Sequence, residues 1–151
     1  MDKLPEVEAA KALMTEAMSW SVMKWLREKK TVRKTADRAN AALDQLSAAV
    51  KARWSDGLKN AYEKLAEQSA NDRVPGRHKK LAEVDSEAAS AALKVKEADD
   101  EAYRARMDAE ETFDEAERQL STSLAREGCR KAIHGWDLHE KAIRKAESAV
   151  R

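Results

Sequence analysis

Few residues in this 151-residue chain are of types that carry out chemistry, since it has three histidines and a single cysteine. His134 and His139 stand five residues apart, about 140° around a helix, which is a poor geometry for holding one metal ion. Neither they nor His78 follow a glutamate by three residues, the spacing that helical carboxylate metal sites use. We therefore expect no metal and no other cofactor.

Cys129 is the one candidate nucleophile. It is preceded by Gly128 and followed by Arg130 and Lys131, and a helix beginning there would lower the pKa of its thiol. No neighbouring residues complete a set of nucleophile, base and orienting group. We expect a small, partly buried cysteine and a protein that is not an enzyme.

A basic cluster marks the only dense group of helix-breaking residues, around Pro75 and Gly76. Such a tip suits an acidic partner protein, a phosphate or a nucleic acid, although no aromatic residue is interleaved to stack on bases. The alternative is that these charges only keep a helix start solvated. The candidate residues for binding an anionic partner are Arg73, Arg77, Lys79 and Lys80.

The two terminal segments are richer in large apolar residues than one helix seam can bury. Residues 14–34 combine methionine and tryptophan with a basic run, a pattern typical of segments that bind a partner's groove or a membrane surface. The alternative is packing against the C-terminal helix or a second copy of the chain. The predicted partner-binding residues are Leu13, Met14, Met18, Trp20, Met23, Trp25, Leu26 and Trp136.

Composition narrows the class of protein. The chain has 29 Lys+Arg against 28 Asp+Glu, 38 % charged residues, and 29 alanines. This balance predicts long helices or coiled coil and gives no overall attraction to nucleic acid or membrane. No apolar run of 18 residues and no signal peptide is visible, so we expect a cytoplasmic protein without a transmembrane segment.

The spacing of glycine and proline predicts the elements. Neither residue occurs between Pro5 and Gly57 or between Gly76 and Gly128. We expect one all-helical domain over 1–151, with a first arm at 5–70, a turn at 71–76 and a second arm at 77–150. A bend is possible near residue 128, because glycine is unfavourable inside a helix.

Narrow apolar seams on both arms predict how they pair. An antiparallel fold-back places residue i of the first arm near residue 147 − i of the second, so that large residues face alanines and a basic block faces an acidic one. The predicted fold is therefore all-α, a long antiparallel helical hairpin that is coiled-coil-like with an Ala-rich seam and thicker apolar ends. The alternative is a three- or four-helix bundle, formed if the terminal helices fold back.

The sequence predicts the function only in general terms. We expect a non-enzymatic helical interaction or spacer protein that presents the basic tip and the apolar Trp/Met end to partner proteins or to itself, which makes a protein partner or a homo-oligomer the expected binding partner. The alternative is a binder of nucleic acid or of an anionic surface, through the tip and residues 27–34.

Overall fold

A computed structural model describes residues 3–70 and 86–150, with side chains for 3–67 and 87–150. Throughout these ranges the regular structure is helical, which confirms the all-α prediction. The helices are α1 (Pro5–Ala17), α2 (Val22–Ala52), α3 (Asp56–Ala70), α5 (Ser86–Gln119) and α6 (Thr122–Ser148).

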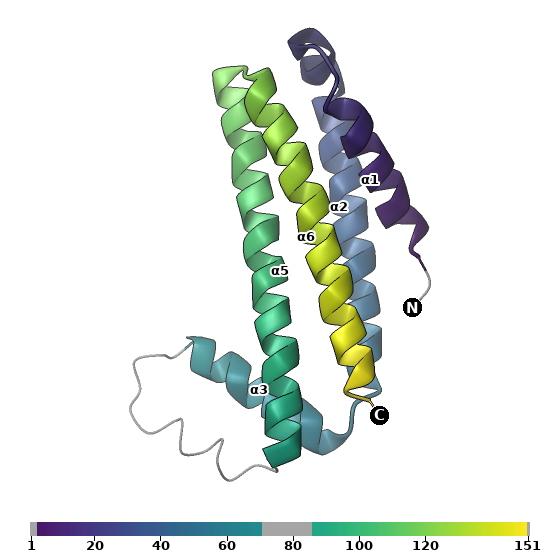
Figure 1. The fold of residues 1–151 in the computed structure, drawn as a ribbon, viewed down its shortest axis with the longest axis vertical. Coiled ribbons are helices and arrows are strands. Elements are labelled where there is room, and N and C mark those ends of the chain that lie inside the picture. Colours follow the sequence, from purple (N-terminus) through teal and green to yellow (C-terminus); the bar gives the residue numbers. More distant parts are fainter. Residues whose placement is uncertain (1–2, 71–85, 151) are drawn as a thin grey trace.

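The helices form a bundle in which the terminal segments are folded back (Figure 1). α5 and α6 run antiparallel and pack together along their length, while α2 packs against α6. α1 covers α2 and α6, and α3 packs against α5 at the end of the bundle away from the α5–α6 link. The prediction of a straight hairpin is wrong. The described helices form a bundle, the arrangement that the sequence analysis gave as its alternative.

Three breaks that the sequence analysis missed divide the predicted arms, at residues 18–21, 53–55 and 120–121. None of them contains glycine or proline. Ser21, Ser55 and Ser121 each accept a hydrogen bond from the backbone N–H three residues further on. This capping satisfies an otherwise unpaired donor at the start of a new helix, so the chain can turn without a breaker.

The second arm turns at Leu120, and the bend suggested near residue 128 is misplaced. Gly128 lies buried inside α6, where an added Cβ would stand 2.7 Å from the ring of Phe113. The glycine is therefore a point of close approach between α5 and α6.

The predicted register is visible in ion pairs between α2 and α5. The pairs are Arg33 with Asp114, Arg106 with Asp44 and Lys51 with Asp99. Each lies within three residues of the expected antiparallel alignment. The two helices meet through these long side chains and through Trp25, which stacks on Phe113, while α6 packs along both of them.

Leu120 has a φ of 51°, a left-handed conformation that costs non-glycine residues about 1 kcal/mol or more, and its side chain is 58 % exposed. Replacing Leu120 by glycine is expected to raise the free energy of unfolding by about 0.5–1 kcal/mol, because the strain is relieved and little packing is lost. Urea unfolding followed by circular dichroism measures the change. A fall in stability would show that the exposed leucine side chain stabilises the turn.

Candidate functional site

Most of the residues predicted to form an apolar binding end belong to the core of the chain or pack against it. Met14, Trp20, Trp25 and Trp136 are buried within the chain. Leu13, Met18 and Leu26 are half-buried, and Met23 alone among the eight is exposed, at 65 %. The premise that one antiparallel neighbour would leave this surface uncovered does not hold, because α1 and α6 both pack against α2.

Specific contacts hold these rings in place. Trp25 stacks on Phe113 with ring centroids 5.6 Å apart and an interplanar angle of 15°. The indole N–H of Trp136 donates to the side-chain oxygen of Asn40 at 2.9 Å, and both residues are buried. These tryptophans therefore join α2, α5 and α6 within one chain.

Of the predicted basic regions, only one falls on the described residues. The tip residues Arg73, Arg77, Lys79 and Lys80 lie outside them. On α2, Arg33 pairs with Asp114 and Glu117, whereas Lys29, Lys30 and Lys34 make no ion pair with any described residue. Among the described residues of the basic run on α2, Arg33 alone thus makes ion pairs with the acidic residues at 108–117 of α5.

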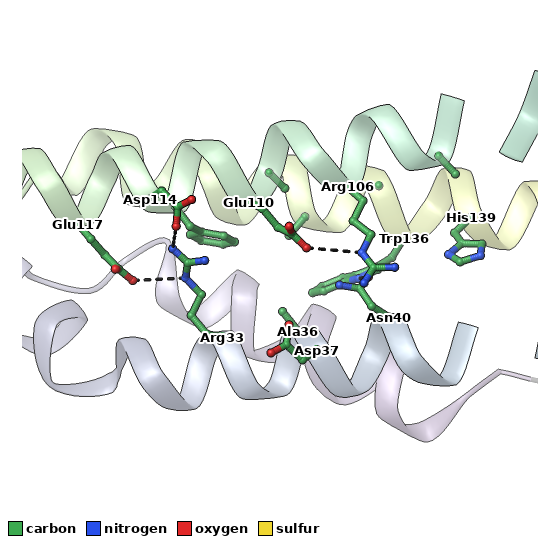
Figure 2. A pocket seen from close by; sticks show the side chains of 15 residues that line it. Arg33, Ala36, Asp37, Asn40, Arg106, Glu110, Asp114, Glu117, Trp136 and His139 are labelled. Carbon is green, nitrogen blue, oxygen red and sulfur yellow. Dashed lines mark hydrogen bonds and ion pairs between the residues drawn. The ribbon is translucent and has the colours of Figure 1, made fainter. Parts of the chain in front are cut away.

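A groove lies between α2 and α5, with α6 as its floor (Figure 2). It consists of two hollows of about 490 and 580 Å³ that share Ala102, Arg106 and His139. We call this surface the α2–α5 groove. It extends along α2 from Arg33 to Lys51, which are 18 residues or about 27 Å apart on a helix.

Small residues make up much of the groove floor. None of their side chains extends beyond a methyl group, and all of them except Ala36 are buried. These residues are Ala36, Ala102, Ala109, Ala132 and Gly135.

Three ion pairs join α2 to α5 across the groove. Arg33 Nη2 lies 2.6 Å from Asp114 Oδ1, Arg106 Nη1 lies 3.2 Å from Asp44 Oδ2, and Lys51 Nζ lies 2.6 Å from Asp99 Oδ2. Figure 2 shows the ion pair of Arg33 with Asp114. It also shows the contact of Arg106 with Glu110 on the same helix, with 3.5 Å between Nε and Oε1.

The charges that line the two hollows do not balance. Four cations face seven carboxylates, a net charge of −3. The cations are Arg33, Lys51, Lys96 and Arg106, and the carboxylates are Asp37, Asp44, Asp99, Asp100, Glu110, Asp114 and Glu117. Asp37 makes no ion pair with a described residue, so the groove has carboxylate left to offer a cationic ligand.

His139 is the titratable group at the junction of the two hollows, with its side chain 16 % exposed. Burial lowers its pKa below 6.5, against the opposing effect of Asp44, whose Oδ1 lies 3.9 Å from Nε2. The imidazole is therefore neutral at pH 7.

Because His139 binds its proton more weakly in the fold than in the unfolded chain, stability is expected to fall as the pH drops through 6.5. The loss ends once the pH is below the pKa in the fold. Urea unfolding at pH 7 and at about pH 5.5 measures it. A His139→Gln variant should show a shallower fall, and an identical fall in both proteins would assign the pH dependence to other groups.

Cys129 has the opposite character from an activated thiol. It is buried in the middle of α6, and burial raises the pKa of its thiol to about 12. A thiol of that pKa is protonated at pH 7 and is a weak nucleophile.

The sequence analysis missed the groove because its lining comes from three helices whose mutual arrangement depends on the breaks. One signal was present. Asn40 occupies the apolar face of the first arm, four residues after Ala36, and a polar residue in such a seam usually has a specific partner. Its partner is the indole of Trp136.

No helix among the described residues is long and apolar enough to cross a membrane, and no group of three or more His, Cys, Asp or Glu there could hold a metal ion. Comparison with protein-family models, with curated proteins and with solved structures finds no match to this chain.

Proposed function

We propose that this chain is a non-enzymatic helical interaction protein, and that its α2–α5 groove binds a basic amphipathic helix of a partner protein. The observation that carries the proposal is the combination of a small-residue floor with a surplus of carboxylates around it. An amphipathic helix laid into a groove is a common mode of peptide recognition. The surplus favours a partner whose polar face carries Lys or Arg.

The dimensions of the groove suit a helical segment. About 27 Å corresponds to five turns of α-helix. Alanine and glycine on the floor let a second helix approach closely, as they do where α6 meets α5 at Gly135, whose added Cβ would stand 3.6 Å from Ala105.

The ion pairs that cross the groove do not prevent a partner helix from entering it. The Arg106–Asp44 pair is substantially exposed at both partners, and exposed ion pairs contribute at most about 1 kcal/mol. A partner helix with its own cations can replace Arg106 at Asp44 and can also engage Asp37. Binding therefore exchanges weak intramolecular pairs for intermolecular ones.

The remaining parts of the proposal rest on the sequence. These are the absence of catalytic activity, the cytoplasmic location, the role as a spacer and the use of the basic tip. Of the apolar Trp/Met end, Met23 is the one predicted residue whose side chain is available as a mostly exposed contact.

Two adjacent alanines allow a matched test in the cells from which the chain comes. Ala48 lines the groove and Ala49, the next residue, is also exposed but lies about 100° further around α2. A photo-crosslinking amino acid at position 48 should give a covalent adduct with a partner segment that is helical and basic, and the same group at position 49 should not. The same adducts from both positions, or none from position 48, would contradict the proposal.

Reversing the charge of groove carboxylates provides a second test of the proposed binding site. Replacing Asp37 and Glu110 by lysine should reduce the adduct from position 48 by about tenfold, since both remove groove carboxylates. An adduct that is unchanged would show that the partner does not use the groove charge. An adduct of twice the mass of the chain would show self-association.

One observation favours the alternative of an anionic-surface binder. Lys29, Lys30 and Lys34 line a shallow hollow of about 400 Å³ together with Arg33, Asp37 and Glu117, and none of these lysines makes an ion pair with a described residue. Binding to anionic vesicles or to nucleic acid through these lysines should weaken steeply between low and physiological salt. Binding that is unaffected by salt would exclude it.

A further inference from the structure

The outer face of the α5–α6 pair has two hollows that the α2–α5 groove does not include. One of about 620 Å³ lies where α5 begins and α6 ends, and one of about 370 Å³ lies near the link between them. Lys94 and Glu115 are 21 residues apart on α5, and Glu127 and Lys141 are 14 residues apart on α6. On a straight helix, 21 residues return to within about 60° of the same direction and 14 residues to within about 40°, so both hollows lie on one side of the α5–α6 pair.

The charges at the two ends of this face are equal and opposite. At the first hollow, which we call the basic end, four cations face one carboxylate, a net charge of +3. These are Lys94, Lys141, Arg144 and Lys145, with Glu87. At the second, the acidic end, five carboxylates face two cations, a net charge of −3. These are Asp108, Glu111, Asp114, Glu115 and Glu127, with Arg118 and Lys131.

The cations of the two ends differ in the ion pairs that they make with described residues. None of the four at the basic end makes an ion pair with a described residue, whereas Lys131 at the acidic end bonds to Asp108 and Thr112. The floor between the four cations is apolar, formed by Ala91, Val95 and Ala149. The basic end is therefore open to an acidic surface that also carries apolar groups.

Exposed apolar side chains flank both ends. Leu93 and Val150, which are 45 % and 37 % exposed, adjoin lining residues of the basic end. Leu120, which is 58 % exposed, follows α5 at the acidic end. Three of the five large apolar side chains exposed in the described part of the chain thus lie close in sequence to residues of the two ends.

We propose that this face binds a second copy of the chain, with the two copies antiparallel. A two-fold axis perpendicular to the helices places α5 on α5 and brings the basic end of each copy to the acidic end of the other. Leu120 of one copy then lies near Leu93 and Val150 of the other. A two-fold axis along the helices would instead bring +3 to +3, so charge selects the antiparallel arrangement.

The spacing of the charges is what identifies the occupant. Lys94 and Glu115 are separated by about 31 Å along α5. A partner that satisfies both ends needs opposite charges at that same separation, and a reversed copy of the chain supplies them. Except for Asp114, which lines both surfaces, the charged residues of this face lie outside the α2–α5 groove, and the inference does not depend on the function proposed for that groove.

Sedimentation equilibrium on the full chain, together with two charge-reversed variants, tests the proposal. The first variant, Lys141→Glu with Lys145→Glu, makes both ends acidic. The second, Glu111→Lys with Glu127→Lys, makes both ends basic. The unmodified chain should approach twice 16.9 kDa, and each variant alone should dimerise at least about tenfold more weakly.

An equimolar mixture of the two variants should recover a dimer, because every contact is again between opposite charges. The recovery also shows that the variants are folded. Lys29→Glu with Lys30→Glu on α2 makes the same charge change away from this face and should leave the dimer intact. An unmodified chain that stays monomeric at about 1 mM, or a mixture that stays monomeric, would overturn the proposal.

Cross-linking tests the orientation without changing charge. A mixture of Leu93→Cys and Leu120→Cys chains, treated with a short thiol cross-linker, should form mixed dimers much faster than either chain forms dimers with itself. The native Cys129 is buried and should not react. Equally fast cross-linking within the Leu93→Cys protein alone would indicate the parallel arrangement and contradict the inference.

Discussion

Replacing Trp54 by alanine is expected to lower the free energy of unfolding by about 3–5 kcal/mol, as is usual when a large buried aromatic side chain is lost. The ring is 4 % exposed and meets Tyr62 edge to face, with centroids 5.5 Å apart. Its indole N–H donates to the carbonyl oxygen of Ala146 at 2.9 Å. Ala146 lies in the last turn of α6, where carbonyl groups lack a helical partner.

Trp54 therefore fastens the end of α6 to the link between α2 and α3. Urea unfolding followed by circular dichroism measures the loss. Trp54→Phe is the matched control, since it keeps an aromatic ring but removes the bond to Ala146, and it should lose a smaller amount that includes about 1 kcal/mol for the hydrogen bond. A loss below about 1 kcal/mol for the alanine variant would mean that the ring is not core.

Replacing Trp25 by alanine is expected to cost a similar amount, about 3–5 kcal/mol. Trp25 is 2 % exposed and stacks on Phe113, so its removal opens a cavity between α2 and α5 at the end where α6 begins. Its indole N–H is buried without an acceptor among the described residues. Trp25→Phe should therefore lose no hydrogen bond, in contrast to Trp54→Phe.

Met23, two residues away, provides the control for Trp25. It is 65 % exposed, so Met23→Ala should change stability by no more than about 0.5 kcal/mol. If Trp25→Ala left stability unchanged but altered binding or mass, the tryptophan would belong to an interface, as the sequence first indicated. Thermal and urea unfolding, with mass by light scattering, distinguish the two results.

The parts of the fold that follow from periodicity were predictable. Three- and four-residue spacing indicated helices throughout, and steric and charge matching placed Arg33 within a few residues of Asp114 and Lys51 close to Asp99. The order of packing was not predictable from the same pattern. A seam of alanines fits α6 as well as α2, and nothing in the spacing distinguishes them.

The breaks are the main reason for the error. The spacing of glycine and proline predicts too few turns, because Ser21, Ser55 and Ser121 each cap the start of a new helix without either residue. Serine followed by a helical pattern is a recognised start signal. Given those three breaks, the terminal tryptophans become core residues, and the surface available for binding moves to the α2–α5 groove and the outer face of α5 and α6.

Small-angle X-ray scattering of the full chain tests the folded-back bundle most directly. The longest helix, α5, has 34 residues and spans about 51 Å, so a monomer should have a maximum dimension of about 65 Å once side chains and links are included. The measurement is made at a concentration where light scattering gives the monomer mass. A maximum dimension of about 100 Å at that mass, the length of a straight arm of about 66 residues, would contradict the bundle.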